Sequence, residues 1–85
     1  MTQRIKMKPD KHELKAVKTA KYFVVLSQIK GYRSYQREEF QTLDKALNYY
    51  QKENSLLYAV DEWDVSVCIQ MPAINEILNN PSNYV

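Results

Sequence analysis

The spacing of apolar residues near the start of the chain predicts a short helix. Asp10 and Glu13 have the separation of a helix-capping box, and the apolar side chains of Leu14, Val17 and Ala20 follow on a narrow stripe. We therefore expect a helix of about ten residues from this stripe.

The next two segments predict a β-hairpin. Residues 22–26 are apolar at both odd and even positions, which is typical of a strand buried on both faces and favours the central position in a sheet. Gly31, the only glycine, lies where a residue that tolerates positive φ suits a turn. Residues 35–40 alternate in polarity, as expected for an edge strand with one wet face.

A second helix begins after Thr42, which has the side chain of an N-cap residue. Four apolar positions then fall at i, i+3, i+4 and i+7, so that they share one helix face. These positions are Leu43, Ala46, Leu47 and Tyr50.

Strict alternation marks the segment after Leu57 as a half-buried strand, with Trp63 on its buried face. The apolar positions of this alternation are Trp63, Val65, Val67, Ile69 and Met71. Two interpretations stay open for residues 57–60: they begin this strand, or they form a separate strand that turns at residues 61–62. Pro72 then begins a last short helix.

These elements predict an α+β fold with chain order α-β-β-α-β-α. We expect a small antiparallel three-stranded sheet of order 2-1-3, with helices packed on one face. Residues 1–85 form a single α+β domain in this interpretation. Residues 1–9 are expected to be flexible or a short edge strand, and residues 82–85 a loose tail.

Composition supports one modest core. The chain has 85 residues, of which 45% are hydrophobic and 26% charged, as in globular rather than disordered proteins. Cys68 is the only cysteine, so an intramolecular disulfide is excluded and a reducing, cytoplasmic location is expected. The longest apolar run, residues 22–26, is too short to cross a bilayer, and we expect no membrane partner.

The net charge of +2 conceals a strong asymmetry. Residues 1–33 contain nine Lys or Arg against two acidic residues, whereas residues 34–85 contain three Lys or Arg against eight acidic residues. This division is compatible with separate basic and acidic faces, or with two halves that neutralise each other in the folded protein.

The sequence predicts neither catalysis nor a metal or cofactor site. Cys68 is expected in a regular strand, where nothing lowers a thiol pKa, and His12 is the only histidine. Glu62 and Asp64 would share one face of a regular strand, yet acid/base chemistry or cation binding needs a pocket and further ligands. A single glycine also excludes the usual phosphate-binding loop.

The expected hairpin tip, residues 30–37, is the most suggestive segment for binding. It combines three cations with two tyrosines, a mixture found in protein-binding hot spots and in sites that stack on nucleic-acid bases. The simplest alternative is that its tyrosines cover the end of the core and its charges keep an edge strand soluble. The candidate partner-binding residues are Lys30, Tyr32, Arg33, Tyr35, Arg37 and, on the second helix, Tyr49.

We therefore expect a small non-catalytic binding protein whose partner is another protein. By its size class, we associate it with phage and mobile-element products that inhibit or redirect host machinery. The alternative is a nucleic-acid-binding regulator that uses the hairpin tip with Lys11, Lys15 and Lys18. The sequence leaves the oligomeric state open.

Overall fold

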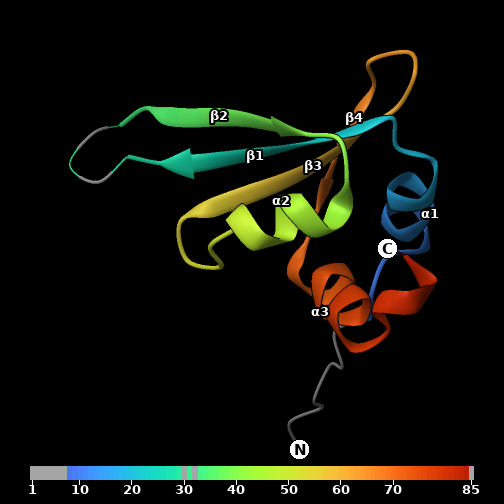
Figure 1. Ribbon diagram of the computed structural model, residues 1–85. Helices are drawn as coiled ribbons and strands as arrows, with labels where there is room; N and C mark the ends of the chain where they lie inside the picture. Colours follow the sequence, from blue (N-terminus) through green and yellow to red (C-terminus); the bar gives the residue numbers. More distant parts are fainter. Residues whose placement is uncertain (1–7, 30, 32, 85) are drawn as a thin grey trace, which may run out of the picture.

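The computed structural model of the protein describes residues 8–29, 31 and 33–84 (Figure 1). The predicted flexible segment or edge strand at residues 1–9 therefore lies almost wholly outside the described residues. The elements are α1 (Lys11–Thr19), β1 (Tyr22–Gln28), β2 (Tyr35–Phe40), α2 (Leu43–Tyr49), β3 (Ser55–Val60), β4 (Ser66–Ile69), α3 (Met71–Asn79) and a 3-10 helix, η1 (Pro81–Asn83).

The sheet is antiparallel, as predicted, but it has four strands in the order β2-β1-β3-β4. The prediction of three strands was wrong. Of the two interpretations left open for residues 57–60, the structure shows the separate strand. The chain turns at Asp61, whose backbone N–H donates to the carbonyl of Val65 at 3.1 Å, and returns as β4. The chain order is therefore α-β-β-α-β-β-α, and the predicted order 2-1-3 survives as part of the larger sheet.

Strand β1 occupies an inner position and is buried on both faces, as its apolar run predicted. Phe23 and Val25 point to the face that also carries Leu57 and Ala59 of β3, and all four are buried. Val24 points to the opposite face and is buried as well. Antiparallel pairing with β2 on one side and β3 on the other satisfies the backbone of this strand.

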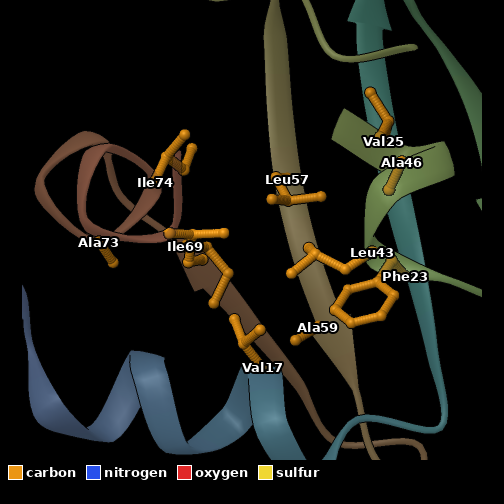
Figure 2. Packing of buried hydrophobic residues seen from close by; sticks show 11 residues of the cluster. Val17, Phe23, Val25, Leu43, Ala46, Leu57, Ala59, Ile69, Ala73 and Ile74 are labelled. Carbon is orange, nitrogen blue, oxygen red and sulfur yellow. The ribbon is translucent and has the colours of Figure 1, made fainter. Parts of the chain in front are cut away.

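All three α-helices contribute to a single hydrophobic cluster on one face of the sheet, which confirms the predicted one-sided helix packing (Figures 1 and 2). Val17 of α1, Leu43 of α2 and Ile74 of α3 meet the inward side chains of the strands. Apolar burial of this kind supplies about 25 cal/mol per Å² and is the main stabilising contribution in so small a chain. The other members of the cluster are Phe23, Val25, Ala46, Leu57, Ala59, Ile69, Ala73 and Ile77.

The start of α1 is capped by Asp10, whose Oδ1 accepts a hydrogen bond from the backbone N–H of His12 at 2.8 Å. The predicted capping box is not completed by Glu13. Its side chain is buried, and its Oε1 accepts the backbone N–H of Gln70 at 2.7 Å. Glu13 thus ties α1 to the residue that precedes α3, because that N–H has no partner within the helix.

The end of the described chain packs back on the core. After η1, the ring of Tyr84 is half-buried against the hydrophobic cluster, and the Lys18 Nζ lies 5.2 Å from its centroid. This distance is within the range of a cation–π contact. Within the described residues, no helix is long and apolar enough to span a membrane.

Candidate interaction surfaces

Residues 61–65, here named the aromatic turn, link β3 to β4 with a fixed backbone. The Oδ1 of Asp61 accepts the backbone N–H groups of Trp63 and Val65, both at 2.9 Å. The N–H of Asp64 donates to the carbonyl of Asp61 at 3.1 Å. Asp64 adopts a φ of 63°, a left-handed conformation that Asp tolerates better than most residues.

The aromatic turn presents Trp63 to solvent. Trp63 is 75% exposed, and Val65 beside it is also exposed. The prediction that Trp63 lies on the buried face of a strand was wrong, because the alternating pattern continues through a turn in which the pleat is lost. An exposed tryptophan on a backbone held by four hydrogen bonds is unusual, since burying such a ring is strongly favourable.

A groove of ≈ 660 Å³ separates the aromatic turn from α1. Lys15 and Thr19 of α1 form one wall, together with Lys21, and Glu62 and Trp63 form the other. The indole ring is therefore framed by charged groups of both signs. This arrangement, an aromatic centre with a polar surround, is typical of protein-binding hot spots.

The second surface is the face of the sheet opposite the helices, here named the open sheet face. The strand registers place on it Val24 and Leu26 of β1 with Tyr58 and Val60 of β3. These four residues line a shallow hollow of ≈ 470 Å³. Arg37, from β2, and Asp64, from the aromatic turn, also line it.

Charge on the open sheet face is sparse. Arg37 forms an ion pair with Glu39 on the same strand, and both side chains are about half exposed. The hydrogen bond to Glu39 is the main cause that raises the pKa of Arg37, so this guanidinium is charged throughout the physiological range. Among the described residues, Asp64 forms no ion pair.

The described residues of the predicted hairpin tip do not form one surface with Tyr49. Arg33 is exposed, and Tyr35 and Arg37 project from the open sheet face. Tyr49 lies on α2, which packs on the opposite face, and its ring centroid lies 5.3 Å from that of Phe40, with the two rings tilted by 44°. Lys30 and Tyr32 lie outside the described residues.

The predicted cationic residues are also divided. Lys11, Lys15 and Lys18 are exposed on α1, which lies at the opposite end of the sheet from the hairpin tip (Figure 1). The structure therefore keeps a basic helix face but separates it from Arg33 and Arg37. A single basic patch that combines the two does not form among the described residues.

The groups considered for catalysis do not converge. Burial raises the pKa of the Cys68 thiol, which keeps it protonated and weakly nucleophilic near neutral pH. Glu62 faces the groove beside α1, whereas Asp64 faces the hollow on the sheet, so the predicted shared strand face of these carboxylates was wrong. In the part of the chain that the structure describes, no group of three or more His, Cys, Asp or Glu side chains is arranged to hold a metal ion.

These features define a class: a small antiparallel sheet backed by helices, with an open face and an exposed aromatic turn. Comparisons with protein-family models, curated proteins and solved structures found no significant match. Sequence reasoning left open a turn at residues 61–62 but did not predict that Trp63 would be exposed there. The available signal was the cluster of acidic residues Asp61, Glu62 and Asp64 around Trp63, which is unfavourable in a strand interior and typical of a turn.

Proposed function

We propose that this protein is a non-catalytic module that binds another protein through the aromatic turn. The observation that carries the proposal is the 75% exposure of Trp63 on a backbone that Asp61 holds in place. A rigid aromatic side chain loses little conformational entropy on binding and buries a large apolar area, which makes it an efficient anchor.

The surroundings of Trp63 favour a protein partner with an apolar pocket and a polar rim. Val65 extends the apolar contact area, and Glu62 supplies a carboxylate beside it. On the α1 side, Lys15 and Lys21 supply cations to the same groove. Charged groups around an aromatic anchor exclude water from the contact and select the orientation of the partner.

The test compares two surfaces of the same chain. Affinity capture from a lysate of the source cell, with identification by mass spectrometry, would use the wild type, Trp63→Ala, and a hairpin variant that combines Arg33→Glu with Tyr35→Ala. Loss of a hot-spot tryptophan is expected to weaken binding by about 30- to 1000-fold, whereas the hairpin variant retains the partner.

The matched control is Leu78→Ala, since Leu78 is another exposed apolar residue but lies on α3. Its capture should equal that of the wild type. If Trp63→Ala captures the same proteins in the same amounts, the aromatic turn is not the docking surface. If only the hairpin variant fails, docking is at the hairpin tip.

A nucleic-acid-binding regulator is the second candidate, supported by the exposed lysines of α1. Lys11, Lys15 and Lys18 are spaced to share one helix face, and Lys21 follows at the end of the helix. Neutralisation of four phosphates by these lysines predicts that log affinity falls with log salt with a slope of about −3.6. A fluorescent oligonucleotide that does not bind even at low salt would exclude this function.

A further inference from the structure

We infer that the open sheet face is the interface of a homodimer, in which two copies of the chain pack sheet against sheet. This surface adjoins the aromatic turn at Asp64 but includes neither Trp63 nor the groove beside it, and the inference does not depend on the proposed partner. The inference rests on an apolar centre that lies between one cation, Arg37, and one anion, Asp64.

The apolar centre comes from the two inner strands. Leu26 of β1 pairs with Leu56 of β3, and Leu56 is 39% exposed. Tyr58 lies next to them on the same face, and Tyr35 of β2, which is 48% exposed, extends the apolar area. The described helices all pack on the other face, so they do not cover these side chains.

The charges on this face are complementary to each other. Arg37 belongs to the edge strand β2, and Asp64 precedes β4 at the other edge; both line the hollow over the inner strands. Arg37 already pairs with Glu39, but a guanidinium has five N–H donors and this pair leaves others free. Asp64 is fixed by its turn and has no ionic partner among the described residues.

A two-fold axis in the plane between the sheets would form the contact between Arg37 and Asp64 twice, once on each side of the axis. In an interface of this symmetry, a contact from residue i to residue j is repeated from j to i. Rotation about an axis that runs along the inner strands exchanges the β2 side with the β4 side. The guanidinium of Arg37, which reaches along β2 to Glu39, then approaches Asp64 of the other copy. At the centre, Leu26 of one copy faces Leu56 of the other.

The same charges argue against nucleic acid as the occupant of this face. Arg37 is its one cation among the described residues, and Glu39 and Asp64 give the face an excess of negative charge. Single-stranded nucleic acid needs several cations along its phosphates in addition to aromatic rings for stacking. A second copy of the chain would cover the apolar centre and would supply Arg37 as the ionic partner of the Asp64 carboxylate.

The size of the sheet sets the strength to be expected. Four strands, spaced about 4.8 Å apart and about six residues long, give the open sheet face an area of roughly 400 Å² per copy. Stable interfaces bury about 800 Å² per partner, so this dimer should be weak and depend on concentration. Measurements must therefore extend to about 1 mM chain, the range of weak association.

Sedimentation equilibrium of the purified protein tests the inference with two charge reversals. Arg37→Asp places two acidic groups opposite each other, and Asp64→Lys places two basic groups opposite each other. Each variant alone should dimerise at least tenfold more weakly than the wild type. An equimolar mixture should form a heterodimer, because the introduced carboxylate of one variant then meets the introduced ammonium group of the other, and the native pair forms on the second side.

The positive φ of Asp64 is a risk for the lysine variant. If circular dichroism shows that Asp64→Lys is unfolded, Ser66→Lys replaces it, since Ser66 lines the same hollow from a regular strand. Recovery of association on mixing supports the inference and excludes misfolding as the cause of its loss. A wild type that is monomeric at about 1 mM, a dimer unaffected by the reversals, or variants that do not associate on mixing would each overturn it. Binding of a fluorescent single-stranded oligonucleotide that Arg37→Asp abolishes would also overturn it.

Discussion

Removal of the Asp61 carboxylate is the most direct test of the aromatic turn. Asp61→Ala deletes the acceptor of two hydrogen bonds of 2.9 Å, from the N–H groups of Trp63 and Val65. Both lie at the surface, so each contributes about 0.5–1 kcal/mol and their joint loss should lower the free energy of unfolding by about 1–2 kcal/mol. For a domain of this size, that corresponds to a decrease in Tm of roughly 5–15 °C.

The sole tryptophan gives this variant a second, local measurement. Time-resolved anisotropy of Trp63 should show a larger fast component in Asp61→Ala, because the turn loses the bonds that orient the indole. Asp61→Asn is the matched control, since its amide oxygen still accepts both bonds. Equal Tm and equal anisotropy in Asp61→Ala and the wild type would refute the claim that Asp61 orders the turn, as would an Asn variant as impaired as the Ala variant.

Three further predictions concern the fold and its thiol. Leu57→Ala removes a side chain with no exposed area, and urea unfolding should show a loss of about 3–5 kcal/mol; a loss below about 1 kcal/mol would contradict the central position of Leu57. Gly31→Ala meets no atom within 4 Å, so its cost comes only from the φ of 85°, about 1 kcal/mol, and Gly31→Asn should cost less in the same thermal melts. Because burial raises the pKa of Cys68, its reaction with iodoacetamide in the folded protein should need a more alkaline pH than in urea, and overlapping pH profiles would show that the thiol is not shielded.

Local sequence patterns were sufficient to predict most of the individual helices and strands. The apolar run of residues 22–26 identified the strand buried on both faces, and the spacing of Leu43 and Ala46 identified α2. These predictions succeeded because the spacing of apolar residues reflects which side chains face the core, and this spacing recurs several times within one element. The packing of the helices on one face of the sheet followed from the same elements.

Alternation failed at the aromatic turn, for a physical reason. Trp63 and Val65 continue the odd-numbered apolar pattern of β4, and a pattern of period two carries no information about whether the backbone between them is extended. The hydrogen bonds accepted by Asp61 determine the turn, and a hydropathy pattern contains no information about such bonds. Local sequence therefore predicted a buried tryptophan where the fold exposes one.

The amino-acid sequence by itself determined the α+β class, the inner strand β1, the hairpin and the helices that cover it. Tertiary structure alone decided which surfaces exist. It separated the lysines of α1 from Arg37, placed Tyr49 and Tyr35 on opposite faces, and brought Arg37 and Asp64 to one hollow. The reason is that hydrophobic periodicity fixes which way a side chain points from its own element, whereas neighbours on a surface depend on strand order and register, which are set by contacts distant in sequence.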